Sequence, residues 1–483
     1  MKTLKILRVL VAAGMFVLVT LFFLGLGGGF GLLEKIQVGT ALLGCSVIPL
    51  VAWFAATLLF GRVYCSVACP LGILQDVLGR LVKLVWWRMR YAPRPDRPWV
   101  RVAAMLVFAV LAVCGGVSLA GLLDPYSVFG RIASGLLQPA AEWMNNALAD
   151  HLGTEGAVVL FKREVFVRSV EGLVVSASAL VLLLVLVAWK GRLVCNTVCP
   201  MGAVLAVLSK KPAFRIAIDP AKCVKCGLCS GACKALCLDG KAQLVDNARC
   251  VRCFNCIGAC PKGAISFAPA WTACLEPKAD ESRRAFLATA GAGVVAAGTV
   301  ACASGRVAVG AAREDVLPPP GTDAAKLNAK CTACGLCVAK CPKKVLVPAE
   351  YGAYGPLSFL QPRMDFAHGF CDPNCTTCGE VCPTGAIPLL DLAGKKQTKI
   401  GLAAFDSAKC LACTEKIPCG LCERRCPQKA ISLKETEIKA GGKSVKVQMP
   451  VVDAAKCTGC GACENYCPAQ AMRVRGLPRA EAK

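Results

Sequence analysis

The chain has 483 residues, of which 55% are hydrophobic, and a formal net charge of +25. Its mean hydropathy of +0.55 excludes a purely soluble protein, and its length allows three or more domains. An ordinary disulfide scaffold is excluded as well, because most of the 34 cysteines follow the C-x2-C-x2-C-x3-C spacing that ligates [4Fe–4S] clusters. Because such clusters are negatively charged and much of the basic excess flanks apolar segments, we expect no nucleic-acid binding.

Four apolar segments are long enough to cross a bilayer whose hydrocarbon core is ~30 Å thick. They span residues 6–26, 38–60, 101–123 and 171–189. Lysine and arginine precede the first segment and are concentrated between the second and the third, so the positive-inside rule places both stretches in the cytoplasm. We therefore predict an all-α transmembrane bundle of four helices over residues 1–210, surrounded by lipid in the cytoplasmic (inner) membrane of a bacterium.

One motif occurs twice in this part of the chain. The string GRVYCSVACPLG over residues 61–72 recurs as GRLVCNTVCPMG over residues 191–202, each time after a pair of predicted spans. A C-x3-C pair on a helix places both sulfurs on one face. The four motif cysteines, Cys65, Cys69, Cys195 and Cys199, could therefore ligate one shared cluster. Two other interpretations stay open: redox-active thiols or a docking surface, and a structural bend set by Cys-Pro and Gly.

Residues 211–270 are predicted to be a cytoplasmic module with the cysteine spacing of a two-cluster ferredoxin. In such ferredoxins the fourth cysteine of each run ligates the other cluster. No proline follows Cys233, and Cys237 comes four residues later, so either thiol could be the ligand, although the spacing favours Cys233. We assign Cys223, Cys226, Cys229 and Cys260 to one cluster, and Cys250, Cys253, Cys256 and Cys233 to the other.

A twin arginine follows this module. Arg283 and Arg284 lie in the string SRRAFL and precede a stretch rich in Ala, Gly and Val. This pattern over residues 271–304 resembles a Tat export signal, which suits a domain whose clusters are assembled in the cytoplasm before export. An ordinary fifth helix, and a cleavage or lipidation site at Cys302, are the alternatives. Residues 305–326 are predicted to be a linker because they are rich in Ala, Gly and Pro.

Residues 327–475 hold four further cysteine groups and are predicted to be an exported domain with four clusters. We expect the first and fourth groups to exchange their last cysteines, Cys341 and Cys467, and the second and third to exchange Cys382 and Cys426. The third group has one cysteine too many. In chain order the groups are Cys331, Cys334, Cys337 and Cys341; Cys371, Cys375, Cys378 and Cys382; Cys410, Cys413, Cys419, Cys422 and Cys426; and Cys457, Cys460, Cys463 and Cys467.

These motifs resemble two families of ferredoxin-type proteins. The first ~270 residues are similar to NapH-type membrane ferredoxins, through the four apolar segments, the two G-R-x2-C-x3-C-P motifs and the two-cluster module. Residues ~282–475 resemble NapG-type ferredoxins, which pair a Tat signal with four exported clusters. The resemblance implies that Cys410, Cys419, Cys422 and Cys426 are the ligands of the third group and that Cys413 is spare. Both families are accessory quinol dehydrogenases of periplasmic nitrate reductase systems, here fused in one chain.

We therefore expect a multidomain protein: a bundle of four helices plus a fifth, Tat-like helix, with α+β ferredoxin-like modules. It would hold about six [4Fe–4S] clusters, or seven with the repeated motif. Electrons would pass from a quinol, menaquinol by resemblance, to a partner oxidoreductase or cytochrome. The chain would be an electron-transfer component of quinol-dehydrogenase type, and we assign no catalytic residue. A c-type haem is excluded, because neither histidine follows a C-x2-C pair.

Two further interpretations remain open from the sequence. Asp124, Tyr126 and Arg131 are a candidate quinol environment at the exported end of the third span, or they cap a helix and face headgroups. The alternative function is assembly or redox regulation of a metalloenzyme by these clusters.

Overall fold

The computed structural model describes residues 2–26, 33–86, 91–152, 161–271, 313, 315–440 and 443–477. The chain divides into two compact units, Met1–Val307 and Ala308–Lys483. Each unit is described by itself. The predicted twin-arginine segment and the helix expected after it lie outside the described residues.

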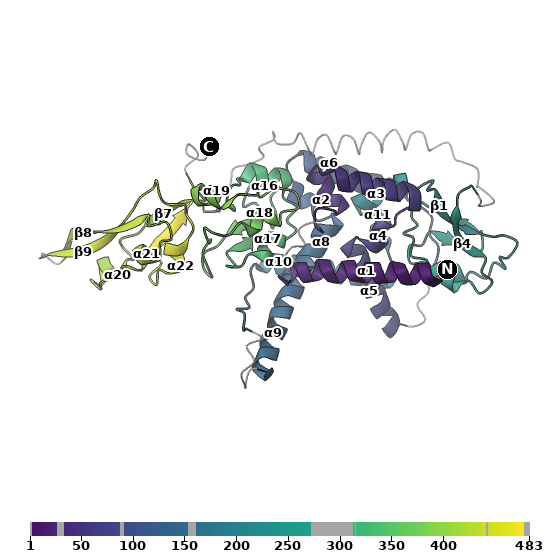
Figure 1. Ribbon diagram of the computed structural model, residues 1–483, viewed down its shortest axis with the longest axis horizontal. Coiled ribbons are helices and arrows are strands. Elements are labelled where there is room, and N and C mark those ends of the chain that lie inside the picture. Colours follow the sequence, from purple (N-terminus) through teal and green to yellow (C-terminus); the bar gives the residue numbers. More distant parts are fainter. Residues whose placement is uncertain are drawn as a thin grey trace. The chain divides into compact units, whose positions relative to one another are not determined.

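The N-terminal unit begins with a helical part, drawn in purple and blue in Figure 1. Its elements are α1 (Lys2–Phe23), α2 (Val38–Leu43), α3 (Val47–Phe60), α4 (Tyr64–Val67), α5 (Pro70–Val85), α6 (Pro98–Val113), α7 (Val117–Ala120), α8 (Pro125–Ile132), the π-helix η1 (Ala133–Leu137), α9 (Gln138–Leu152), α10 (Val170–Lys190), α11 (Leu193–Thr197) and α12 (Pro200–Leu208).

Two of these helices are long and apolar enough to cross a membrane, and both coincide with predicted spans. They are Thr3–Phe23 within α1 and Val170–Lys190, which is α10. The other two predicted spans are each divided among the described residues. The segment 38–60 breaks between α2 and α3, where Cys45 has a φ of 54°, and 101–123 breaks between α6 and α7, where Gly115 has a φ of 74°. A left-handed residue ends a helix, so a bundle of four continuous spanning helices is not observed.

The repeated motif occupies equivalent places in two helical hairpins. The short helix α4 and the longer α5 follow α3, just as α11 and α12 follow α10. Helix α10 packs against α5 and α8, while α12 packs against α3 and α6. The two copies of the motif therefore meet inside the helical part.

A small α+β module completes the described part of this unit, and in Figure 1 its strands β1 and β4 lie near the N-terminal end of α1. Strand β1 pairs antiparallel with β4, and β2 with β3. Backbone hydrogen bonds, such as Ala213 N to Leu58 O at 2.9 Å, join the module to the end of α3. Its elements are β1 (Phe214–Ile218), α13 (Leu228–Ala232), β2 (Leu238–Asp239), β3 (Leu244–Val245), α14 (Asn255–Ala259) and β4 (Ile265–Pro269).

The described part of the C-terminal unit consists of short helices and three antiparallel strand pairs: β5 with β6, β7 with β10, and β8 with β9. The helices are α16 (Ala324–Lys330), α17 (Leu336–Lys340), α18 (Thr377–Glu380), α19 (Leu392–Gln397), α20 (Leu411–Thr414), α21 (Leu421–Arg424) and α22 (Ala462–Asn465). The strands are β5 (Leu346–Pro348), β6 (Pro362–Met364), β7 (Leu402–Phe405), β8 (Ile431–Ala440), β9 (Lys443–Val452) and β10 (Met472–Arg475).

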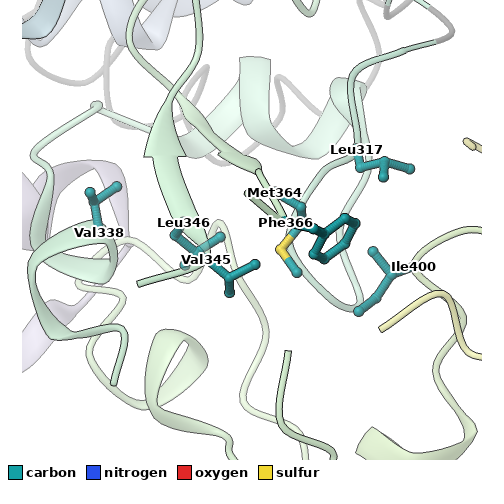
Figure 2. Packing of buried hydrophobic residues seen from close by; sticks show 7 residues of the cluster. All are labelled: Leu317, Val338, Val345, Leu346, Met364, Phe366 and Ile400. Atoms are coloured by element: carbon teal, nitrogen blue, oxygen red, sulfur yellow. The ribbon is translucent and has the colours of Figure 1, made fainter. Parts of the chain in front are cut away.

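One apolar cluster in this unit supports several of the cysteines. Figure 2 shows Leu346 of β5, Met364 of β6 and Phe366 grouped with Val338 of α17 and with residues from the neighbouring loops. Four partly buried cysteines pack against this cluster, so it fixes the positions of their sulfurs: Cys337, Cys341, Cys371 and Cys378.

Candidate iron–sulfur sites

The cysteines of the N-terminal module surround two cavities. The last cysteine of each run lies with the other run, which is the exchanged arrangement of two-cluster ferredoxins. Site 1 is lined by Cys223, Cys226, Cys229 and Cys260. Site 2 is lined by Cys250, Cys253 and Cys256 together with both Cys233 and Cys237.

Site 2 therefore holds one thiol more than a [4Fe–4S] cluster requires. The sulfurs of Cys233 and Cys237 lie 3.6 Å apart and both side chains are buried. Hydrogen bonding from Cys237 lowers the pKa of Cys233. The same thiol, helped by Arg252, lowers the pKa of Cys250 to about 5. Thiolate is the ligating form of cysteine, so these two thiols are shifted toward the form that iron requires. Burial instead raises the pKa of Cys253 and Cys256, and hydrogen bonding raises that of Cys237.

Lys234 stands where the ferredoxin pattern has proline, and it joins the module to the helices. Its Nζ donates to Asp76, which also accepts from Arg8 Nη2 at 2.5 Å and from Arg192 Nε at 2.7 Å. Burial alone would raise the pKa of the Asp76 carboxyl, but Arg192 and Lys234 hold it well below its usual range. Removing one partner from such a buried network costs about 3–5 kcal/mol. At the position of the missing proline, Lys234 thus has a structural role: its ion pair with Asp76 attaches the module to the helices.

In the C-terminal unit the four cysteine groups combine as two neighbouring pairs. Cys341 lines a cavity with Cys371, Cys375 and Cys378, which we call site 4. Cys382 packs with Cys331 in one apolar core, and Cys337 lies within electrostatic range of Cys331, Cys334 and Cys382. This set is site 3. The first and second groups therefore exchange their last cysteines.

The third and fourth groups do the same. Site 5 is a cavity lined by Cys410, Cys419, Cys422 and Cys467. In site 6 the Cys463 thiol lies within electrostatic range of Cys426, Cys457 and Cys460. Cys413 does not line the site 5 cavity, although its thiol is hydrogen bonded to Cys410.

The predicted exchange of the first group with the fourth, and of the second with the third, is therefore wrong. The reason is local packing. Strands β5 and β6 lie between the first two groups, and the β7–β10 pair encloses the last two, so each consecutive pair of groups shares its own core.

Four of the terminal cysteines share a hydrogen-bonding pattern. A backbone N–H shortly after each one donates to its sulfur: Ala264 to Cys260 at 3.3 Å, Ala430 to Cys426 at 3.3 Å, and Ala471 to Cys467 at 3.2 Å. Ile387 donates to Cys382 in the same way. The proline after these cysteines starts the turn that brings the donor back. Such bonds stabilise thiolate ligands and tune the reduction potential of a cluster.

The two C-x3-C-P motifs meet in a buried, reciprocal arrangement. Arg62 of the first copy donates to Cys195 O at 2.8 Å, and Arg192 of the second donates to Cys65 O at 2.6 Å. Arg62 Nη2 also lies 3.7 Å from Cys65 Sγ. All four motif cysteines are buried. Each arginine of the repeat therefore anchors the opposite copy.

The glycines of the motif are explained by the same packing. A Cβ on Gly72 would lie 2.3 Å from Cys65 O, and a Cβ on Gly202 would lie 2.3 Å from Cys195 O. Gly61 and Gly191 end the preceding helices with φ values of 75° and 56°. Any larger residue at the first two positions would separate the cysteine turn from the following helix.

The donor set at the repeat fits a negatively charged cluster. Burial raises the pKa of the Cys69 and Cys199 thiols, so as free thiols they would remain neutral. Arg62 and Arg192 place two buried cations beside them. The Cys69 thiol lies within electrostatic range of Cys65, Cys195 and Cys199, so the four motif thiols surround one position.

The candidate quinol environment is structural in character. Asp124 caps α8, because its Oδ2 accepts from Ser127 N at 2.8 Å. Arg131 Nη2 donates to Gly121 O at 2.6 Å. Both residues, and Tyr126, are buried rather than directed outward. Capping by Asp124 is thus observed.

Sequence reasoning missed three residues at these sites. Asp76 and Arg252 join the N-terminal module to the helices, and Lys395 donates to Cys371 Sγ at 3.2 Å. The available signal for Asp76 was that it is the single acidic residue of α5. No local pattern marks the other two.

Comparison with known proteins agrees with the cysteine geometry. A family described as "4Fe-4S dicluster domain" matches residues 417–471, which include most of the third and fourth groups. A family described as "4Fe-4S binding domain" matches residues 44–87 and 171–218, the segments that carry the two C-x3-C-P motifs. No solved structure matches.

Several curated proteins are similar to parts of the chain. The methylamine utilization ferredoxin-type protein MauM of Methylophilus methylotrophus is 35% identical over 172 residues, 34% of this chain and 71% of that protein. MauM of Methylorubrum extorquens is 34% identical over 209 residues, 41% of this chain and 90% of its own length. The ferredoxin-type protein NapG of Haemophilus influenzae is 32% identical over 180 residues, 36% and 62% respectively.

The cysteine cavities and these matches define an iron–sulfur electron-transfer protein of the ferredoxin type, with multiple [4Fe–4S] clusters. More particularly, the chain belongs to the family of ferredoxin-type proteins that includes MauM.

Proposed function

We propose that the chain takes electrons from a quinol, menaquinol by preference, and passes them through about six [4Fe–4S] clusters to a partner oxidoreductase or cytochrome. Fusion of a NapH-type membrane part with a NapG-type exported domain is part of this proposal. The observation that carries it is the sorting of the ferredoxin-type cysteines into six sets, each with the sulfurs that one cluster needs.

In the C-terminal unit these sets form a series. Sites 3 and 4 belong to one module and sites 5 and 6 to the other. The modules meet where Cys371 N, at site 4, donates to Cys460 O, at site 6, at 2.8 Å. Electrons would therefore pass in the order site 3, site 4, site 6, site 5, or in reverse. Clusters suit this role because their potentials are tuned by local hydrogen bonds and exposure.

A membrane location is supported by the outward faces of α1 and α10. Only 28% and 17% of their most apolar windows are buried within the protein. A core helix of a soluble protein buries most of its apolar surface. Leu7, Leu10, Val181 and Leu182 are instead more than half exposed, which suits contact with lipid acyl chains.

The repeated motif is proposed to hold a further cluster, shared by Cys65, Cys69, Cys195 and Cys199. The buried thiols, the two arginines and the match of both segments to a 4Fe-4S binding family support this assignment. A cluster here would supply a one-electron station between the N-terminal module and the bilayer.

The proposal is tested with isolated membranes that contain the chain. Addition of a menaquinol analogue under anaerobic conditions should bleach most of the cluster absorbance that dithionite bleaches. Membranes without the chain are the control. If dithionite bleaches the clusters and the quinol does not, the chain is no quinol oxidant, and the assembly or regulatory role becomes the better explanation.

A further inference from the structure

A buried lysine contacts the sulfurs of site 4. Lys395, in α19, is only 5% exposed. Its Nζ donates to Cys371 Sγ at 3.2 Å, and its charge also acts on Cys378. The side chain lines the site 4 cavity itself. A positive charge therefore lies in direct contact with one presumptive cluster ligand and close to a second.

No carboxylate forms an ion pair with Lys395 among the described residues, although Asp372 also lines the site 4 cavity. The exposed lysines Lys409 and Lys456, in contrast, pair with aspartates. A buried cation needs a counter-charge, because its desolvation is unfavourable. At site 4 the groups in direct contact with the lysine that can supply this counter-charge are the cysteine ligand Cys371 and the cluster it would hold.

The next residue provides a comparison within the same helix. Lys396 follows in sequence and is exposed, so its charge is screened by water. Asp391 is the N-cap of helix α19, and its Oδ1 accepts from Gly394 N at 3.1 Å. That cap sets the rotation of this short helix, and with it which of the two lysines faces the cysteines.

We propose that Lys395 is a positioning residue that raises the reduction potential of the cluster at site 4. Adding an electron makes a cluster more negative, and a buried cation at its ligand favours the reduced form. Site 4 is also the site whose Cys371 contacts the other module. The lysine therefore stabilises the reduced form of the cluster that lies at the junction of the two modules.

This inference rests on the proposed function only in that site 4 must contain a cluster. The test is a potentiometric titration of the full chain, followed by EPR, with iron analysis of each sample. Lys395→Met keeps most of the side-chain volume and removes the charge. This substitution should lower the equilibrium constant for reduction of one cluster at least tenfold. For a one-electron couple that is a fall in reduction potential of about 59 mV.

The matched variants decide the cause. Lys396→Met should leave every component unchanged, and Lys395→Arg, which keeps a charged donor, should shift the same component much less than methionine does. The component concerned is the one that disappears in Cys375→Ser. Wild-type iron content with unchanged potentials in Lys395→Met overturns the role of the lysine alone. Wild-type chain that lacks iron at site 4 overturns the proposed function instead.

If Lys395→Met itself loses iron, the same titration is made with Lys395→Gln, whose amide still donates without a charge. A lowered potential supports the proposal. An unchanged potential shows that hydrogen bonding, and not charge, is what the cluster needs, and overturns it.

Discussion

Cys233 and Cys237 place two buried thiols at one coordination position of site 2. Spacing alone favours Cys233, but the fold brings both sulfurs to the cavity. The loop that follows Cys233 turns back instead of starting with proline, because Lys234 is fixed by Asp76. The lysine that attaches the module to the helices thus takes the place of the proline, and Cys237 is available as a second ligand.

We predict that these two thiols replace each other. Cys233→Ser and Cys237→Ser should each keep nearly the full iron content and shift the EPR signal of one cluster. The double variant should lose about four irons per chain. Iron analysis and EPR check this, with Cys114→Ser, an exposed cysteine outside all the groups, as control. Loss of four irons in only one of the single variants would identify that cysteine as the sole ligand.

At the scale of elements, the two copies of the C-x3-C-P motif allow a prediction about iron content and electron transfer. Cys65→Ser or Cys195→Ser should lower the iron content by about four and abolish quinol-linked reduction of the exported clusters. Serine nearly preserves the side-chain volume, so the chain should still insert into the membrane. Iron analysis and stopped-flow reduction measure the two effects, and Cys114→Ser again serves as control.

Wild-type iron and wild-type rates in both variants would leave the motif as a structural bend. Unchanged iron with a reduced rate would instead favour redox-active or docking thiols.

The elements also show what sequence can establish. Cysteine spacing identified every ferredoxin-type group, because a fixed cluster geometry demands a fixed spacing. It could not decide which groups share a core, since that depends on strands as short as β5 and β6. The division of two predicted spans was missed because hydropathy averages over Cys45 and Gly115, where the backbone turns. Lys395 was missed because 24 residues separate it from Cys371.

At the scale of the whole molecule, the proposed topology requires that the two units be made on one side of the membrane and used on both. The twin arginine between them is the proposed export signal. Arg283→Lys combined with Arg284→Lys should block export of residues 304–483 almost completely, and leave the helical part inserted. Protease added to spheroplasts should digest the C-terminal unit of the wild type and spare that of the variant.

Arg306→Lys, outside the pair, is the matched control. Equal digestion of wild type and double variant would show that export does not use this signal, and that segment 271–304 is an ordinary helix.

Arg62 and Arg192 each donate to the opposite copy of the motif, so the first copy can complete its hydrogen bonds only after the second has been synthesised. Arg62 needs Asn196 and Cys195 O as acceptors, at 2.8 Å each, and these emerge from the ribosome more than a hundred residues later. Until then the acceptor that its own copy supplies among the described residues is the Cys65 sulfur, at 3.7 Å. We expect the nascent first half to be a substrate for membrane chaperones and proteases. Synthesis of the second half should end this, because the two copies of the motif then pack together in one cooperative step. A half-length chain would then be degraded rather than accumulate, although its sequence contains a complete copy of the motif.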